Sequence, residues 1–281
     1  MALLRRVVSA FDRIAPLRLA ESWDNVGVLL EAPFPREGAK GILLTIDLTP
    51  EVLSEALILD DVGVIVAYHP TIFRGWKSLT LAPEGSRDAE KVKQEMILTL
   101  AAKGISVYSP HSSLDACQDG LSDWLASGLA PLGIASIAPV SPTDASTPES
   151  PEGNGRIVTL STPAPLSSVV TAIKAHLGLP HLRLAESMRG HAVSTIALCA
   201  GSGISVVTKA ASRADLYWTG EMGHHEVLAS VATGTHVVLC EHTNTERGYL
   251  RAGLLPRLQR ELGPDVAIHV SNADRDPLVI V

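Results

Sequence analysis

Aromatic residues are scarce in this 281-residue chain, which contains four Trp, four Tyr and three Phe. Hydrophobic residues nevertheless make up 46% of the sequence and charged residues 19%, which is typical of a folded globular protein and excludes a largely disordered one. The core must therefore consist mainly of Ala, Val, Leu and Ile. Such a core suits buried parallel strands covered by helices, and the chain length favours two domains.

Cysteine is rare as well, and the three residues Cys117, Cys199 and Cys240 form no CxxC motif. Scattered thiols exclude a disulfide framework and a thiolate zinc site, and they indicate a reducing compartment. No apolar run reaches the roughly 18 residues of a membrane helix, so we expect no membrane association. The net charge of -7 argues against direct binding to the phosphate backbone of a nucleic acid.

The N-terminal segment 1–21 carries two early arginines, but Asp12 and Glu21 follow and its apolar residues recur at helical spacing. We interpret the segment as the first helix of the folded protein, and a mitochondrial presequence is the alternative. The expected location is the cytoplasm, with the mitochondrion or the nucleus as alternatives.

Four segments share one pattern, in which a short apolar run is followed by polar residues and then by helical periodicity. They are residues 41–48, 62–67, 105–109 and 236–240. Strands that alternate with helices predict an α/β fold with mainly parallel central sheets. In such sheets ligands bind beyond the carboxyl ends of the strands, so candidate functional residues should lie there.

The segment 139–155 consists almost entirely of Pro, Ser, Thr, Gly, Asp, Glu and Asn. Because it contains little apolar surface to bury, we expect a flexible linker. It would separate a first α/β unit, residues 1–138, from a second unit, residues 156–281. In the second unit, residues 156–160 predict a strand and residues 166–179 an amphipathic helix.

Three histidines, His69, His111 and His242, each follow a predicted strand closely. Asp115 lies four positions after His111, and Glu246 lies four positions after His242, so each pair shares a face if its segment is helical. An imidazole nitrogen and a carboxylate oxygen together form half of a site for a divalent transition metal.

Each of these features also has a simpler interpretation. His69 alone could be a hydrogen-bonding loop residue. The His111 and His242 segments could be N-capping turns whose acidic residues interact with a helix dipole. A His–carboxylate pair follows two predicted strands and a third strand ends at His69, and this coincidence leaves a metal site and the simpler interpretations both open.

Seven segments together resemble the Ngg-one-interacting factor three-like family, whose bacterial members are known as GTP cyclohydrolase I type-two homologues. The resemblance covers nearly the whole chain, and its EHTNTERGYL and DRDP forms are similar to the eukaryotic branch. The segments are LAESWDNVGVLL (19–30), VIVAYHPTIF (64–73), VYSPHSSLDA (107–116), ALCAGSG (197–203), DLYWTGEMGHHEVL (215–228), CEHTNTERGYL (240–250) and ADRDPLVIV (273–281).

This resemblance implies two interlinked α/β units, a divalent metal site in a cleft between them, and a ring-shaped homo-oligomer. The family's metal ligands correspond to His69, Asp115, His242 and Glu246, and His111 corresponds to a histidine close to the metals. The ion would be zinc, iron, manganese or magnesium. Bacterial members commonly have two adjacent histidines where this chain has Tyr68 and His69, and a neutral phenol is a poor ligand, so we predict one firm metal position and one doubtful one.

Several other residues in these segments each have more than one possible role. Glu221 is the candidate for proton transfer, with a helix-capping role as its alternative. Gly201 and Gly203 could form a simple turn or an anion-binding loop. We expect Trp23 to be a packing anchor, and Asp24 to belong to a turn or to contact substrate.

The function that best fits these observations is a metal-dependent hydrolase-like activity on a phosphoester or nucleotide-type substrate. One alternative is a non-catalytic, metal-stabilised interaction protein that acts through transcriptional or other protein partners. Another is hydrolysis of a ring of the GTP cyclohydrolase type.

Overall fold

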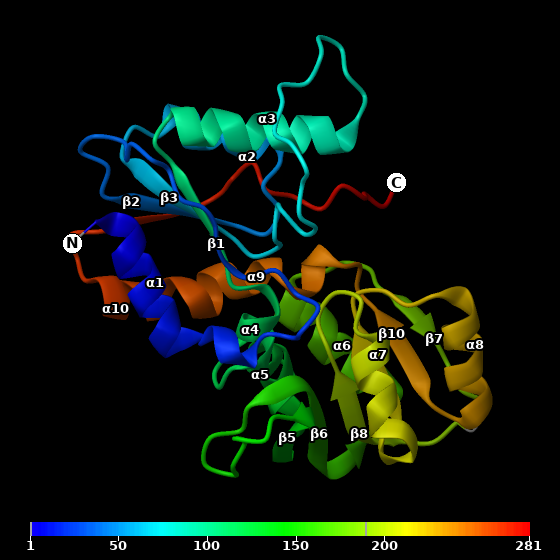
Figure 1. The fold of residues 1–281 in the computed structure, drawn as a ribbon. Coiled ribbons are helices and arrows are strands. Elements are labelled where there is room, and N and C mark those ends of the chain that lie inside the picture. The colour runs from blue at the N-terminus through cyan, green and yellow to red at the C-terminus, as the bar shows by residue number, and fades with distance from the viewer. Residues whose placement is uncertain (1, 189) are drawn as a thin grey trace. The chain divides into compact units, whose positions relative to one another are not determined.

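The computed structural model describes residues 2–188 and 190–281 and contains two compact α/β units (Figure 1). Unit 1 comprises Met1–Leu114 and Leu250–Arg275, and unit 2 comprises Asp115–Tyr249 and Asp276–Val281. The chain passes from one unit to the other three times, so each unit is built from two separate segments. This confirms the predicted pair of interlinked α/β units.

Among the described residues, unit 1 contains five strands, and each of them except the second, which follows the first directly, comes after a helical segment. Its elements are α1 (Leu3–Ile14), η1 (Leu17–Leu19), β1 (Gly27–Leu30), β2 (Gly41–Thr45), α2 (Pro50–Ile58), β3 (Val62–Ala67), α3 (Ala89–Ala102), β4 (Ser106–Ser109), the π-helical turn η5 (Leu250–Leu254), α10 (Leu255–Leu262) and β11 (Ala267–Val270). Helix α4 (His111–Ala116) begins at the end of this unit's first segment.

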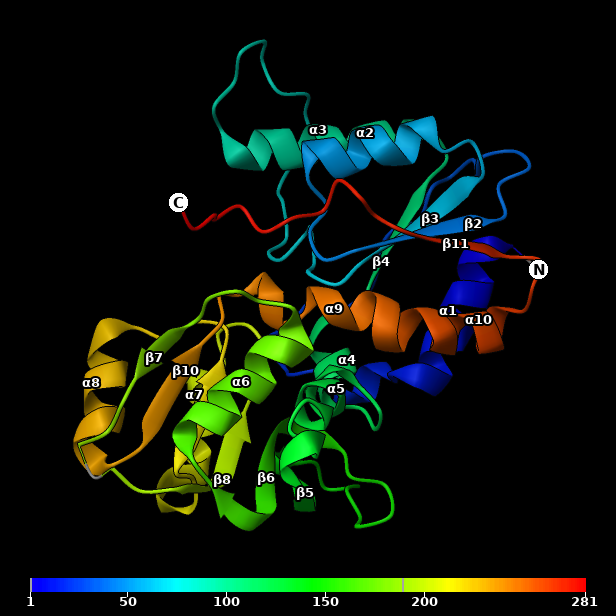
Figure 2. The same cartoon turned by 180° about the vertical axis from the view of Figure 1, so that it is seen from behind.

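The sheet of unit 1 has the order β1-β4-β3-β2-β11. Strands β4, β3, β2 and β11 run parallel to one another, and β1 pairs with β4 in the antiparallel direction. Helices α2 and α3 cover one face and helices α1 and α10 cover the other (Figures 1 and 2). Both faces are thus removed from water, which explains why β2 and β3 are almost continuously apolar.

Local sequence features define the helix that follows β2. Thr49 is the N-cap of α2, its hydroxyl accepts the N–H of Val52, and Pro50 occupies the first turn, where a missing N–H costs nothing. On the opposite face, the ring of Phe11 in α1 stacks on Tyr108 of β4 with 4.7 Å between the ring centroids.

In the part of unit 2 that the structure describes there are six strands. Its elements are α5 (Leu121–Ser127), η2 (Ala130–Leu132), β5 (Ile134–Pro142), β6 (Gly153–Ala164), α6 (Leu166–Leu177), β7 (Arg183–Ala185), β8 (Val193–Leu198), α7 (Ile204–Val207), η3 (Thr208–Arg213), β9 (Leu216–Thr219), α8 (His224–Thr233), β10 (His236–Leu239), η4 (Thr243–Thr245) and α9 (Arg247–Tyr249).

The sheet of unit 2 has the order β5-β6-β8-β9-β10-β7. Strands β8, β9 and β10 are parallel, whereas β5, β6 and β7 pair in the antiparallel direction. Helices α7 and α8 cover one face, and α5 and α6 cover the other (Figures 1 and 2). The parallel centre ends at the loops that carry Gly201, Glu221 and His242.

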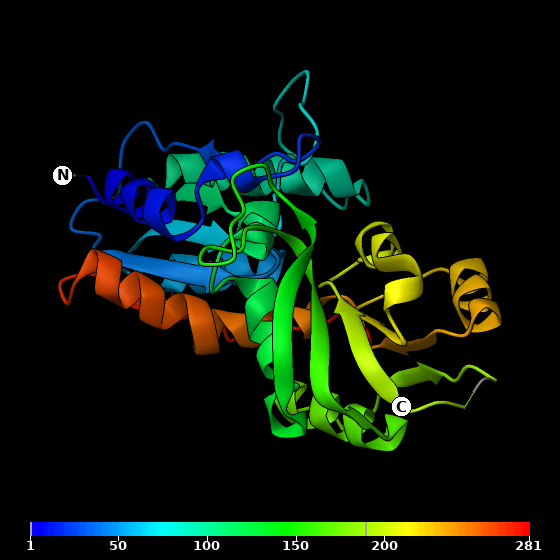
Figure 3. The ribbon, with the colours of Figure 1, turned by 90° about the horizontal axis from the view of Figure 1, so that it is seen from below.

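The segment 139–155, for which we expected a flexible linker, lies within unit 2. Residues 139–142 end β5, residues 153–155 begin β6, and the two strands form a long antiparallel hairpin (Figure 3). The ladder of backbone hydrogen bonds and the burial of Val140 order a segment whose composition is polar. The compact units therefore differ from the expected ranges 1–138 and 156–281.

Within the described ranges, every helix is too short or too polar to cross a lipid bilayer.

Gly104 lies where its segment passes very close to the backbone around Arg36 in unit 1. Its φ is +72°, and a Cβ atom there would lie 2.4 Å from the backbone nitrogen of Arg36. Gly85 has nearly the same φ of +71°, but no described atom outside its chain neighbours lies within 4 Å of a Cβ there. We expect Gly85→Ala to cost about 1 kcal/mol through backbone strain, and Gly104→Ala to cost roughly 2–4 kcal/mol because a clash is added. Urea denaturation measures both values, and equal losses would contradict this packing.

Glu55 of α2 holds the chain after β11, because its carboxylate accepts the N–H of Asn272 at 2.9 Å and of Ala273 at 3.3 Å and also the hydroxyl of Ser271. Burial raises the pKa of Glu55, but these hydrogen bonds outweigh it, so the pKa lies below its ordinary value of 4.5. A lowered pKa means that the stabilisation is complete above the unfolded-state value and is lost as the pH falls through the folded-state value.

We therefore expect Glu55→Gln to lower the unfolding free energy at pH 7, and the difference from wild type to shrink as the pH falls below about 4.5. Glu95→Gln, at an exposed position on α3, is the control. Denaturation at several pH values measures the difference, and a difference that grows towards acid pH would refute the role of Glu55.

Candidate metal centre

In unit 1, three polar side chains follow three neighbouring parallel strands at the same distance. Asp47, His69 and His111 each lie two residues beyond the end of β2, β3 and β4 respectively. The backbone N–H groups of Tyr68 and His69 continue the pairing to β2, donating to Thr45 at 2.9 Å and Ile46 at 3.0 Å. The sheet therefore places these side chains at one edge, as the sequence predicted for the two histidines.

His69 is oriented by a carboxylate. Its Nδ1 lies 2.9 Å from Oδ1 of Asp47. A carboxylate at Nδ1 favours the tautomer that carries the proton on that nitrogen, which leaves the lone pair of Nε2 as the metal-binding atom. This is the arrangement usually found behind histidine ligands.

His111 has a matching partner in Asp24, whose Oδ1 lies 2.8 Å from Nδ1 of the histidine. The other oxygen of Asp24 accepts the N–H of Ser112 at 3.1 Å and its hydroxyl. Burial raises the pKa of Asp24, but the bonds from His111 and Ser112 outweigh it, and the pKa lies below its ordinary range. Asp24 is thus a charged partner that fixes the orientation of the His111 ring.

Tyr68 packs against both histidines of unit 1. It is 2% exposed, and its ring centroid lies 5.0 Å from that of His69 and 5.3 Å from that of His111. The two imidazoles are themselves 5.4 Å apart. The phenol therefore forms an apolar wall of this group, and our expectation of a weak second metal position stays a prediction.

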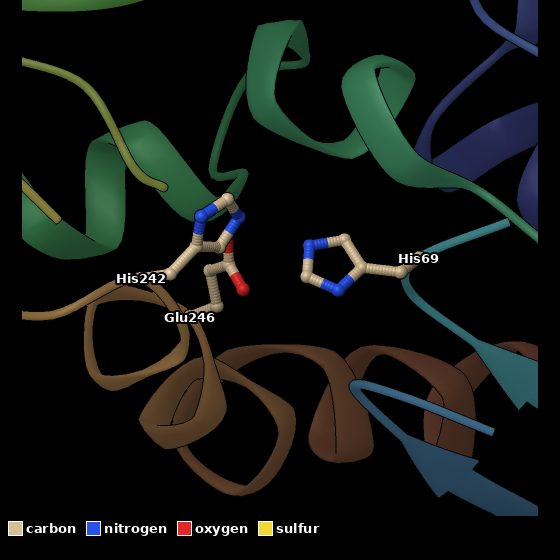
Figure 4. A group of neighbouring side chains, drawn as sticks. All are labelled: His69, His242 and Glu246. Atoms are coloured by element: carbon tan, nitrogen blue, oxygen red, sulfur yellow. The ribbon is translucent and has the colours of Figure 1, made fainter. Parts of the chain in front are cut away.

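In unit 2, His242 and Glu246 point toward one another, and Figure 4 draws them together with His69. Nε2 of His242 lies 3.4 Å from Oε1 of Glu246. Two ligand atoms that are each about 2.1 Å from a tetrahedrally coordinated ion are separated by about 3.4 Å, so this pair has the spacing of two ligands of one ion. Glu246 is only 1% exposed, and a buried carboxylate requires compensating charge or hydrogen bonds.

Glu221, the candidate for proton transfer, contacts His242 directly. Its Oε1 lies 3.0 Å from Nδ1 of that histidine, and Glu221 follows β9 by two residues. The geometry repeats the Asp47–His69 and Asp24–His111 pairs. Glu221 is thus placed to orient His242.

Glycine is required beside this pair. Gly201 follows β8 with a φ of +56°, and a Cβ atom there would lie 2.8 Å from both Nε2 of His242 and Oε1 of Glu246. Its N–H donates to the hydroxyl of Thr245 at 2.9 Å, and the N–H of Gly203 donates to the hydroxyl of Thr219 at 3.0 Å. These N–H groups already donate to hydroxyl groups of the protein and are not available to an anion. The contacts therefore favour the simple turn over the anion-binding loop.

Two non-glycine residues at these strand ends have a left-handed backbone. They are His111, with a φ of +30°, and Glu241, with a φ of +65°, directly before His242. Glu241 is held by an ion pair with Arg183 at 3.0 Å. Such strain usually persists where the surrounding structure requires a particular side-chain direction.

The remaining predicted ligand, Asp115, is half-buried on α4, so the segment that carries His111 and Asp115 is helical as expected. Among the described residues, His69, His242 and Glu246 form a group that could hold a metal ion, and His111 and Asp115 are outside this group. Nearby, burial raises the pKa of the Cys240 thiol to about 12, and a protonated thiol is a poor ligand.

Sequence reasoning missed Asp47 as a partner of His69 and identified Asp24 only as a turn residue or substrate contact. The contacts that define both roles join residues 22 and 87 positions apart. The available signal was the position of Asp47, an acidic residue at the end of an apolar strand that runs parallel to the strand before His69.

The family model of Duf34/NIF3 (NGG1p interacting factor 3) matches residues 2–277. The chain is 47% identical to the Protein NIF3 homolog of Schizosaccharomyces pombe, over 98% of this chain and 96% of that protein. It is 34% identical to the NGG1-interacting factor 3 of Saccharomyces cerevisiae, over 99% of this chain and 97% of that protein.

Solved structures show the same fold. A Bacillus cereus protein related to NIF3 aligns with a TM-score of 0.82 at 19% identity and covers 99% of this chain and 98% of its own. Reduced HcgD from Methanocaldococcus jannaschii aligns with a TM-score of 0.73 at 21% identity, over 96% and 97% of the two chains. Together with the sequence matches, these findings lead to one conclusion: the chain belongs to the Duf34/NIF3 family.

Proposed function

We propose that this protein binds a divalent metal ion through His69, His242 and Glu246 and acts as a metal-dependent hydrolase on a phosphoester or nucleotide-type substrate. Asp115 is proposed as a further ligand and His111 as a neighbouring histidine. The observation that carries the proposal is the 3.4 Å contact between Nε2 of His242 and the buried carboxylate of Glu246. Family membership and the resemblance of the motifs support the same residues.

The donor set suits zinc, iron or manganese, because it combines imidazole nitrogen with carboxylate oxygen. A bound ion would supply Lewis acidity, which polarises an electrophile and lowers the pKa of water. The residues of this chain would orient the ligands and hold the proton or the substrate. Asp47 and Glu221 would keep Nε2 of His69 and His242 aimed at the ion, and His111, fixed by Asp24, would be available to hold a proton or a polar substrate group.

A second candidate function is that of an interaction protein whose metal stabilises the fold. The name of the Saccharomyces cerevisiae relative, NGG1-interacting factor 3, favours it. The two functions differ in whether the ion keeps a ligand position for substrate or water. Turnover of phosphomonoesters, phosphodiesters, nucleotides or cyclic amides by the metal-loaded protein supports the hydrolase, and absence of turnover across that panel supports the interaction protein. We also propose a homo-oligomer and a cytoplasmic location.

Removing single ligands tests the metal centre. We expect His69→Ala, His242→Ala and Glu246→Ala each to lose most of the metal that copurifies with the wild type, because each removes a direct ligand. His269→Ala is the matched control, since His269 also pairs with a carboxylate, Asp61, at 2.9 Å, but lies on β11. Elemental analysis measures the metal per chain. Wild-type metal content in the Glu246→Ala protein would refute the site, and wild-type content in His69→Ala would exclude a ligand from unit 1.

Glu221→Gln tests the orientation of His242. The amide keeps the shape of the side chain but removes the negative charge that favours the required tautomer, so we expect metal affinity to fall about 10- to 100-fold while the thermal stability of the metal-free protein is unchanged. Competition with a chromogenic chelator measures the affinity. If the affinity stays at the wild-type value, Glu221 does not orient His242 and its role as a proton-transfer group becomes the better assignment.

A further inference from the structure

Trp23 and Phe73 form an exposed aromatic pair in unit 1. Trp23 is 58% exposed and Phe73 is 46% exposed, and their ring centroids are 6.0 Å apart. The expectation that Trp23 is a packing anchor was therefore wrong, because most of its indole lies outside the core. An exposed Trp beside an exposed Phe is an apolar patch of the kind that marks a binding surface.

The backbone around Trp23 is fixed although its side chain is exposed. On one side, the N–H of Glu21 donates to the hydroxyl of Ser112 at 3.0 Å. On the other side, Asp24 bonds to Ser112 and His111. The side-chain amide of Asn25 donates to the carbonyl of Ile72, next to Phe73. These bonds fix the backbone on both sides of Trp23 and next to Phe73 before any ligand arrives, which reduces the entropy lost on binding.

The pair adjoins the histidine group of unit 1. The ring of Trp23 meets the ring of His111 edge to face, with centroids 6.0 Å apart and an angle of 78° between the planes. A ligand that contacts the indole therefore lies within reach of the imidazole that Asp24 orients. The planes of Trp23 and Phe73 are tilted by 45° to one another, so the two rings are not stacked face to face.

We propose that the Trp23–Phe73 pair binds the planar heteroaromatic ring of the substrate, which is the base of a nucleotide-type substrate. The inference rests on the proposed function, since it places the ring at one end of a substrate whose reacting group is near the histidines. The indole offers a flat aromatic face on which such a ring can stack. Stacking of a base on an aromatic side chain is tolerant of ring substituents, so the pair selects a class of ring.

Binding of adenosine monophosphate, compared with ribose 5-phosphate, tests the inference on the whole chain after removal of metal with a chelator. We expect the wild type to bind adenosine monophosphate more tightly than ribose 5-phosphate. Trp23→Ala should weaken adenosine monophosphate binding by about 5- to 150-fold and leave ribose 5-phosphate unaffected, and Trp23→Phe should retain part of the affinity. Phe34→Ala is the control, because Phe34 is an 83% exposed aromatic residue of the same unit.

Isothermal titration measures the affinities, and sedimentation velocity of the same samples measures the assembly state. Equal wild-type affinities for the two compounds, or unchanged adenosine monophosphate binding in Trp23→Ala, would overturn the inference. A change of assembly state in Trp23→Ala without a change of affinity would also overturn it and identify a second copy of the chain as the occupant. A wild type that binds metal but not adenosine monophosphate would refute this inference alone, and a wild type that binds adenosine monophosphate but not metal would refute the metal proposal alone.

Discussion

A carboxylate hydrogen bond at Nδ1 of a histidine is the interaction on which the candidate site depends. It occurs three times, in the pairs Asp47–His69, Asp24–His111 and Glu221–His242. Each bond fixes the tautomer and the direction of a ring that would otherwise rotate in a loop. Because two of the carboxylates and all three histidines follow parallel strands, the sheets supply the positions and the carboxylates supply the orientation.

The second constraint is space around the buried Glu246. Its carboxylate stays close to Nε2 of His242 only because residue 201 has no Cβ, and the left-handed backbone of Glu241 turns the chain immediately before His242. Both features restrict which residues fit and neither adds apolar burial. A chain that needed only stability would not require them, which is why we interpret this region as functional.

The sequence predicted the parallel strands well, because the apolar run 62–67 coincides with β3 and the runs 41–48, 105–109 and 236–240 contain β2, β4 and β10. It did not predict the β5–β6 hairpin, where backbone pairing orders a polar segment. His242 and Glu246 were recognisable because their spacing is local. The roles of Asp47 and Asp24 depend on tertiary contacts, and the exposure of Trp23 depends on what the fold leaves uncovered, so spacing along the chain carries no direct sign of any of them.

We propose that histidine nitrogen and carboxylate oxygen hold the ion. X-ray absorption at the zinc edge of the metal-loaded wild type tests it most directly. We expect a nitrogen and oxygen shell at about 2.0–2.1 Å with outer-shell scattering from two imidazoles. A sulfur shell at about 2.3 Å, or a light-atom shell without imidazole scattering, would contradict it.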